Sequence, residues 1–181
     1  MAKDLEELIK GCRSRKLASQ SSLYKLYKDR FFVLSLKYCK NREEAQDNLQ
    51  DSFIEIFKRI KQYQGKGSFE GWMKRIVINK AIDRYKKEIR KITFEDKGER
   101  EEAVEIEEKL NISLDEILNC IQNLPTQYRL VFNLYEMDGY SHKEISTMLS
   151  ISEGTSKSNL HRAKVSLKEQ LEGLKQENNG Q

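Results

Sequence analysis

A chain of 181 residues that is 38% hydrophobic and 34% charged can form one large domain or two small ones around a core. Its single proline, nine glycines and few alternating β-branched stretches predict an all-α fold. The longest apolar runs are only a few residues, and charged residues follow the first methionine closely. We therefore expect no signal peptide, no membrane insertion and a cytoplasmic location.

The three cysteines, Cys12, Cys39 and Cys120, are widely spaced and form no CxxC pair. This pattern argues against a disulfide framework and against a zinc site, so we expect neither a metal nor another cofactor. Ordinary core cysteines are the favoured interpretation, with redox sensing by one of them as the alternative.

The net charge of +4 conceals an uneven distribution along the chain. Residues 1–94 hold 23 Lys and Arg against 12 Asp and Glu, residues 95–116 hold 3 against 10, and residues 117–181 hold 7 against 7. The distribution predicts two helical domains, 1–92 and 113–175, joined by an acidic linker over 93–112 that has no clear helical period.

Two helices are expected before residue 40. A short one covers about 1–13, and a longer one begins near Ser19 and runs to about Cys39. Apolar residues three and four positions apart predict one broad buried face on the longer helix. That face consists of Leu23, Leu26, Tyr27, Phe31, Leu34 and Tyr38.

The next predicted helix, about Arg42 to Gln62, has an unusual outward side. It mixes acidic, amide and aliphatic side chains at helical spacing: Asp47, Gln50, Asp51, Ile54 and Lys58. A solvated helix face has no need of an isoleucine, whereas the groove of a protein partner could bind it. The alternative is an ordinary surface with one exposed hydrophobic residue.

A flexible basic loop, Gln64 to Ser68, precedes a cationic helix from Phe69 to about Lys91. The loop's two glycines allow close approach to a ligand, but the GxxxxGK[ST] spacing of a phosphate loop is absent. From Lys74 onward the helix carries eight Lys or Arg against two acids, a density that suits a nucleic-acid backbone. Its apolar side is Trp72, Ile76, Ala81, Ile82, Tyr85 and Ile89. Base stacking is the alternative to a core role for Trp72.

After the linker, one helix is expected from Ser113 and another from about Pro125 to Asp138. A helix-turn-helix follows, because Ser141 and Glu144 have the spacing of a capping box and Ser152 can cap a second helix. The second helix directs apolar residues inward: Leu160, Ala163, Leu167, Leu171 and Leu174. Its opposite face is cationic and fits the DNA major groove, with a merely solvated basic face as the alternative.

Four stretches resemble bacterial RNA polymerase sigma factors of the extracytoplasmic-function (ECF) group, in order and at the family's spacing. They are EEAQDNLQDSFIEIFKRI at 43–60, GSFEGWMKRIVINKAIDRYKK at 67–87, LPTQYRLVFNLYEMDGYSHKEIS at 124–146 and EGTSKSNLHRAKVSL at 153–167. The resemblance implies a protein without catalytic activity that binds core RNA polymerase and directs promoter recognition, DNA melting and transcription initiation. The implied partners are the β′ clamp helices and β subunit of core RNA polymerase, promoter DNA and an anti-sigma factor.

The resemblance also assigns roles to residues. The implied polymerase-binding residues are Asp47, Gln50, Asp51 and Ile54. The resemblance implies that a base of the minus-ten element is flipped into a pocket. The residues implied to bind this element are Gln64, Lys66, Ser68, Lys74, Arg75, Asn79, Lys80, Arg84, Lys86 and Lys87. Those implied to bind the minus-thirty-five element are Thr155, Lys157, Ser158, His161, Arg162 and Lys164. The acidic linker is implied to thread the RNA channel of the polymerase.

Three positions depart from the family pattern. Ser150 stands where glycine is frequent, Ser156 where valine packs, and Asn159 where arginine contacts phosphate. We expect the first two to loosen the domain, and the third removes a phosphate ligand.

Two functions other than a sigma factor are less consistent with the sequence. A helix-turn-helix regulator that acts without polymerase would need a dimer interface or an effector domain, and the sequence shows neither. A nuclease would use His142, His161 and nearby acids, but no cluster with metal-ligand or nucleophile spacing supports it.

Overall fold

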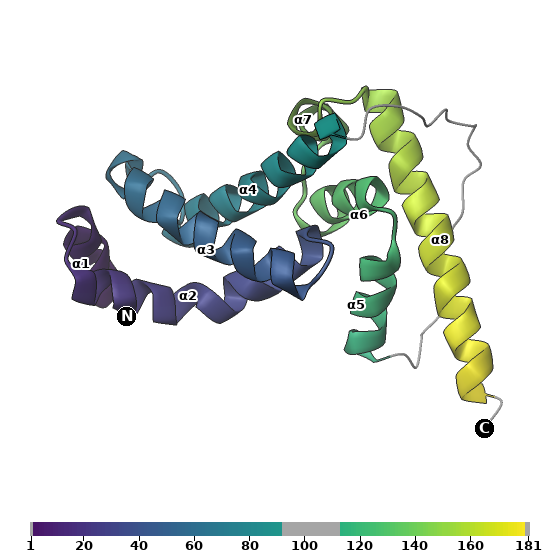
Figure 1. Ribbon diagram of the computed structural model, residues 1–181, viewed down its shortest axis with the longest axis horizontal. Coiled ribbons are helices and arrows are strands. Elements are labelled where there is room, and N and C mark those ends of the chain that lie inside the picture. The colour runs from purple at the N-terminus through teal and green to yellow at the C-terminus, as the bar shows by residue number, and fades with distance from the viewer. Residues whose placement is uncertain (1, 92–112, 180–181) are drawn as a thin grey trace. The chain divides into compact units, whose positions relative to one another are not determined.

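The computed structural model describes residues 2–91 and 113–179, and these residues form helices and short connections without a strand (Figure 1). The helices are α1 (Ala2–Arg13), α2 (Leu17–Tyr38), α3 (Arg42–Arg59), the 3-10 turn η1 (Ile60–Gln62), α4 (Phe69–Lys91), α5 (Leu114–Asn123), α6 (Thr126–Phe132), the π-helical turn η2 (Asn133–Met137), α7 (His142–Leu149) and α8 (Glu153–Asn179). The prediction of an all-α, two-domain fold is confirmed.

The chain divides into two compact units, Met1–Tyr85 and Lys86–Gln181. The division falls within the last turns of α4, before the domain end predicted at residue 92. The predicted linker over 93–112 lies outside the described residues. None of the described helices is both long enough and apolar enough to cross a membrane.

The first unit has a core built from the apolar faces of α2, α3 and α4. Phe53 of α3 lies at its centre, with ring centroids 4.8 Å from Tyr24 and 6.1 Å from Phe31 of α2. Phe53 is 3% exposed, and the large apolar side chains of this unit with less than 2% exposure are Leu23, Ile56, Ile60, Met73, Val77 and Ile78. Cys12 and Cys39 are free thiols in the same interior.

Two residues predicted for the core are exposed: Leu26 of α2 is 56% exposed and Ile89 near the end of α4 is 46% exposed. The buried stripe of α2 consists of Leu23, Tyr27 and Phe31. Leu26 comes three residues after Leu23, which places it roughly 60° away from Leu23 around the helix, on the solvent side of this stripe. Ile89 lies one turn beyond the buried Tyr85.

A buried polar contact joins the three large helices of the first unit. The Asn48 side-chain amide on α3 donates to the Ser35 hydroxyl on α2 at 3.1 Å and to the Val77 carbonyl on α4 at 3.3 Å. All three side chains are fully buried. Because a buried amide is costly without partners, this contact favours one packing arrangement of α2, α3 and α4 over others.

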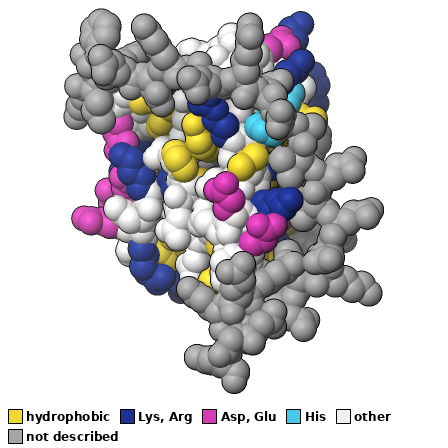
Figure 2. Space-filling model, turned by 90° about the vertical axis from the view of Figure 1, so that its right-hand side faces the viewer, with side chains coloured by type: hydrophobic (Ala, Val, Ile, Leu, Met, Phe, Trp, Pro, Cys, Tyr) yellow, Lys and Arg dark blue, Asp and Glu magenta, His cyan; other side chains and the backbone are white. Residues whose placement is uncertain are grey.

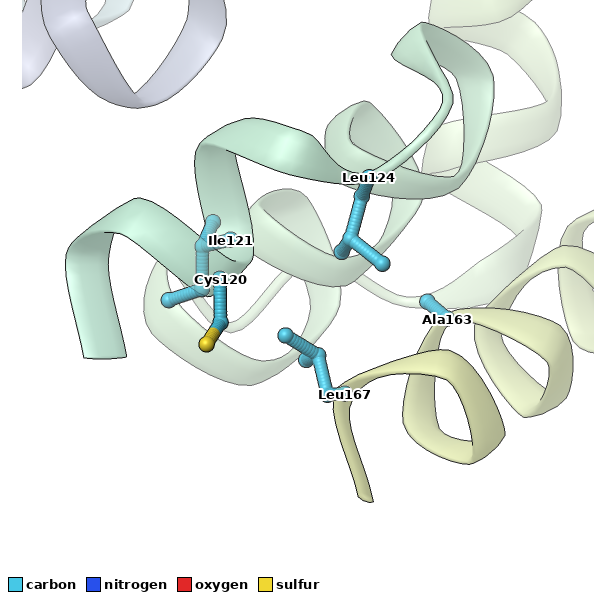
Figure 3. Close-up of a cluster of buried hydrophobic side chains, with 5 residues drawn as sticks. All are labelled: Cys120, Ile121, Leu124, Ala163 and Leu167. Carbon is cyan, nitrogen blue, oxygen red and sulfur yellow. The ribbon is translucent and has the colours of Figure 1, made fainter. Parts of the chain in front are cut away.

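The second unit packs α5 and α6 against α8. Cys120, Ile121 and Leu124 contact Ala163 and Leu167 in one apolar cluster (Figure 3). Leu171 and Leu174 are half-buried against the cluster, so the predicted inward stripe of α8 is confirmed. Cys120 is a buried free thiol of this core.

The capping box predicted at the start of the helix-turn-helix is confirmed, because Ser141 forms a complete capping box with Glu144. Ser113, the predicted start of a helix, forms a second capping box with Glu116 that was not predicted. Ser150 ends α7 in the left-handed conformation at φ 59°, which explains why glycine is the easier residue there. The Ser152 hydroxyl accepts the Thr155 N–H at 2.9 Å and so caps α8.

The predicted single helix from Pro125 to Asp138 is only partly right. The α-helix ends at Phe132 and continues as η2, where the Asp138 N–H donates to the Asn133 carbonyl at 3.1 Å. This wider turn adds one residue to the helical repeat, and nothing in the local sequence period signals it.

Candidate functional site

The outward side of α3 presents the four residues predicted for a protein partner. Asp47, Gln50, Asp51 and Ile54 are all exposed, and Ile54 is 53% exposed. They lie on one helix face because their spacings of three and four residues each span about one turn. We call these four residues the α3 strip. Ile54 lies one turn beyond Asp51, so the strip joins two carboxylates to an exposed aliphatic group that the groove of a protein partner could bind.

Arg84 of α4 contacts the acidic residues of the α3 strip. Its Nη1 lies 3.4 Å from Asp47 Oδ2, and its Nη2 lies 3.2 Å from Asp51 Oδ2. The sequence places Arg84 among the residues predicted to bind the minus-ten element. In the structure, its guanidinium also pairs with two carboxylates of the α3 strip. Lys80 lies on the same side of α4, with its ammonium 3.9 Å from Glu55.

The loop from Gln64 to Ser68 is shaped by its glycines. Gly65 and Gly67 have φ values of 76° and 78°, a region that side chains with a Cβ rarely adopt. The Tyr63 hydroxyl donates to the Gly67 carbonyl at 2.8 Å, and the Ser68 hydroxyl accepts the Gly71 N–H at 3.0 Å at the start of α4. Gln64, Lys66 and Ser68 remain exposed.

Trp72 packs into an aromatic cluster beside this loop. Its ring centroid lies 5.5 Å from Phe69 in a stacked arrangement and 5.7 Å from Tyr63. The side chain is half-buried, so the core role favoured from the sequence agrees with the structure.

The outer side of α4 carries the remaining predicted minus-ten residues. Arg75, Asn79 and Lys87 are exposed, and Lys74 and Lys86 are half-buried. Arg75 and Asn79 are separated by four residues and therefore share a helix face. The structure thus places an amide and a guanidinium side by side, which suits contacts to a base edge and a phosphate.

The six residues predicted for the minus-thirty-five element lie on the first turns of α8. They differ in solvent exposure and in whether the protein supplies a partner for the side chain. Lys157 is exposed, and Ser158 and His161 are half-exposed. Arg162 Nη1 donates to the Tyr128 hydroxyl at 3.2 Å, and the Lys164 ammonium lies 2.7 Å from Glu136 Oε1.

Thr155 belongs to the cap of α8, because its hydroxyl lies 2.8 Å from the Ser152 hydroxyl. Asn159 is 4% exposed, so this side chain does not lie on the outward side of α8. On the face that Figure 2 draws, acidic and basic side chains lie interspersed with hydrophobic ones.

His142 connects the two helices of the helix-turn-helix. Its Nδ1 lies 2.9 Å from the Ser156 hydroxyl of α8, and its ring stacks on Tyr135 with centroids 4.4 Å apart. Ser156 is fully buried, and a buried hydroxyl is costly without a hydrogen-bond partner. His142 supplies that partner for the hydroxyl that stands where the family pattern has valine. Desolvation by burial and, after it, the charge of Lys157 lower the pKa of His142, against an opposing effect of Glu153.

We expect His142 to make the stability of the second unit depend on pH. Because its pKa is lower in the folded chain than the unfolded value of 6.5, the unfolded state takes up the proton first. The stabilisation is present above pH 6.5 and is lost as pH falls through the folded pKa. Urea unfolding followed by circular dichroism should show that the free energy of unfolding falls more between pH 7.5 and 5.5 for the parent chain than for His142→Asn. Equal losses would contradict this role.

Several contacts of the site are missed by sequence reasoning. Three side chains of the site pair with residues that are distant in the sequence: His142 with Ser156, Arg162 with Tyr128, and Lys164 with Glu136. The partners are 14 to 34 positions apart. No local spacing connects such pairs. A polar residue at an otherwise apolar helix position, as at Ser156, is the one signal that the sequence offers.

Comparison with known families identifies both units. The sigma-70 region 2 family matches residues 23–91, and the sigma-70 region 4 family matches residues 114–167. The class of protein is therefore a sigma-70 type factor in which region 2 precedes region 4 along the chain.

Individual relatives place the chain within that class. It is 31% identical over 163 residues to the ECF RNA polymerase sigma factor SigW of Bacillus subtilis, covering 82% of this chain and 87% of the relative. It is 29% identical over 165 residues to the ECF RNA polymerase sigma factor SigE of Mycolicibacterium smegmatis, covering 86% of this chain and 62% of that longer relative. The chain belongs to the ECF sigma factors, which direct transcription initiation.

A solved structure shares the fold. The sigma factor RpoE of Bartonella quintana, in complex with the anti-sigma factor NepR, superimposes with a TM-score of 0.53 at 17% identity, covering 84% of this chain and 96% of that one.

Proposed function

We propose that this ECF sigma factor binds core RNA polymerase through the α3 strip and holds the two promoter elements on separate helical units. The observation that carries the proposal is the division of exposed groups. One side of the first unit is acidic and aliphatic, while the outer sides of α4 and α8 carry cations, with the amide of Asn79 among those of α4. Proteins and nucleic acids are bound by these two chemistries respectively.

The α3 strip would dock on the β′ clamp helices, with further contacts to the β subunit. Asp47 and Asp51 supply charge for a cationic partner, and Ile54 supplies apolar area. A helix face of this mixed kind can combine steering by charge with burial of an aliphatic group at the centre.

The loop at 64–68 and the outer side of α4 would bind the minus-ten element. Flipping a base out of the duplex costs a few kcal/mol, which contacts to its edge must return. Asn79 can donate and accept hydrogen bonds at such an edge, and Arg75 beside it can hold a phosphate.

The outward side of α8 would read the minus-thirty-five element in the major groove. Lys157 is exposed, and Ser158 and His161 are half-buried beside it. Arg162 and Lys164 contact Tyr128 and Glu136 respectively. The proposed domains are 1–92 and 113–175, with the acidic linker at 93–112 between them.

Further partners and properties belong to this proposal. An anti-sigma factor is a fitting partner, since the related fold of RpoE was solved with one. We also propose a cytoplasmic protein without catalytic activity or bound cofactor. A helix-turn-helix regulator acting without polymerase is the weaker candidate, because it assigns no role to the α3 strip.

Replacing Asn79 by alanine should impair promoter opening more than initial binding. Removing a base-edge contact worth about 1 to 3 kcal/mol predicts an opening defect of about 5-fold to 150-fold. Permanganate reactivity of unpaired thymines measures opening, and footprinting on closed complexes measures binding. Asn123→Ala removes an exposed amide at the end of α5 and serves as the matched control. Permanganate reactivity equal to that of the parent chain would exclude Asn79 from the pocket.

A further inference from the structure

Arg84 of α4 lies against the acidic residues of the α3 strip. Its guanidinium bridges two carboxylates of the α3 strip, Asp47 at 3.4 Å and Asp51 at 3.2 Å, through two different nitrogens. The side chain of Arg84 is 28% exposed, while those of Asp47 and Asp51 are 61% and 56% exposed. The arginine therefore lies against the protein, and the carboxylates remain open to a partner.

The position of Arg84 on its helix separates it from the DNA-facing side. Arg75 and Arg84 are nine residues apart, which in an α-helix turns the side chains by roughly 180°. Arg75 and Asn79 face outward, and Arg84 faces α3. A single rigid helix cannot present both arginines to one DNA strand without bending that strand around it.

We propose that Arg84 is a positioning residue of the α3 strip and not a phosphate ligand. The inference rests on the proposed role of that strip in binding polymerase. Two carboxylates one turn apart repel each other and can adopt several rotamers. The planar guanidinium fork restricts both, so less conformational entropy is lost when a partner binds. Lysine has one compact ammonium and cannot hold the same pair as firmly.

The test measures affinity for core polymerase without DNA, by fluorescence anisotropy of labelled protein. Arg84→Ala should weaken binding by about fivefold, the order expected for immobilising two side chains, and Arg84→Lys should fall between it and the parent chain. Arg30→Ala is the matched control, because Arg30 forms a similar interhelical pair with Glu70 at 3.3 Å, away from the strip. It should leave the affinity unchanged.

Two further measurements separate positioning from other effects. In an Asp47→Asn, Asp51→Asn background, Arg84→Ala should have no additional effect on core affinity, because nothing is left to position. The salt dependence of promoter binding by the assembled holoenzyme should be unchanged in Arg84→Ala, whereas loss of one phosphate ligand would reduce its slope by about 0.7 to 0.9.

The outcomes distinguish the inference from the proposed function beneath it. Unchanged core affinity in Arg84→Ala together with a reduced salt slope would overturn the inference and make Arg84 a phosphate ligand. Equal losses in Arg84→Ala and Arg30→Ala would also overturn it, because the effect would then be general. Retained core binding by Asp51→Arg would overturn the role of the strip itself. If Asp51→Arg loses affinity for core polymerase and Arg84→Ala does not, the proposed role of the strip stands and only the inference about Arg84 is overturned.

Discussion

Replacing Asp51 by arginine should abolish binding to core RNA polymerase while leaving the chain folded. Asp51 lies at the centre of the α3 strip, one turn from both Asp47 and Ile54, and its side chain is 56% exposed. Reversal of its charge removes an attraction to a cationic partner and introduces a repulsion. Juxtaposed like charges at an interface cost several kcal/mol, so we expect binding to weaken by at least about 100-fold.

The fold should tolerate this substitution, since exposed positions seldom change stability by more than about 0.5 kcal/mol. The new arginine would repel Arg84, but both side chains can move into solvent. Asp29→Arg is a matched control: it reverses a carboxylate that is 86% exposed on α2, outside the strip. Co-elution with core polymerase measures the result, and an Asp51→Arg chain that still co-elutes would contradict the proposed docking surface.

Replacing Ile145 by alanine should unfold the second unit selectively. Ile145 on α7 is completely buried, and the loss of a large buried aliphatic side chain costs about 2 to 5 kcal/mol. For a small domain this loss corresponds to a shift of about 1 to 3 M in the urea midpoint. Ile145→Val removes one methylene from the same site, and should cost about 0.5 to 1.5 kcal/mol.

The chain contains a built-in probe for this experiment. Its one tryptophan, Trp72, lies in the first unit, so its fluorescence reports on that unit while far-ultraviolet circular dichroism reports on both. We expect Ile145→Ala to shift the dichroism transition of the second unit and to leave the fluorescence transition in place. Core polymerase binding should survive, and minus-thirty-five recognition should be lost. A common shift of both signals would show that the two units unfold together.

Local interactions are the part of this structure that the sequence reveals. The capping boxes at Ser113 and Ser141 join residues three positions apart, so a serine and a glutamate at that spacing suffice to predict them. The α3 strip and the inward stripe of α8 follow from helical periodicity in the same way. The sequence also shows the helix-turn-helix, because its two helices are adjacent in the chain.

Contacts between helices are not encoded in this local form. Arg84 pairs with residues 33 and 37 positions earlier, and its place among other cations suggests DNA when the sequence is read alone. Asn48 meets Ser35 and Val77 only after three helices have packed. Leu26 shows the converse, because its residue type favours burial while its angular position exposes it. Tertiary packing decides these cases and overrides residue type.

Transcription in vitro with purified core polymerase tests whether this chain acts as a sigma factor. We expect the parent chain to direct core polymerase to defined start sites on a panel of promoter templates, and Asp51→Arg to fail to do so. If the folded parent chain leaves initiation as random as it is with core polymerase alone, the proposed function is wrong.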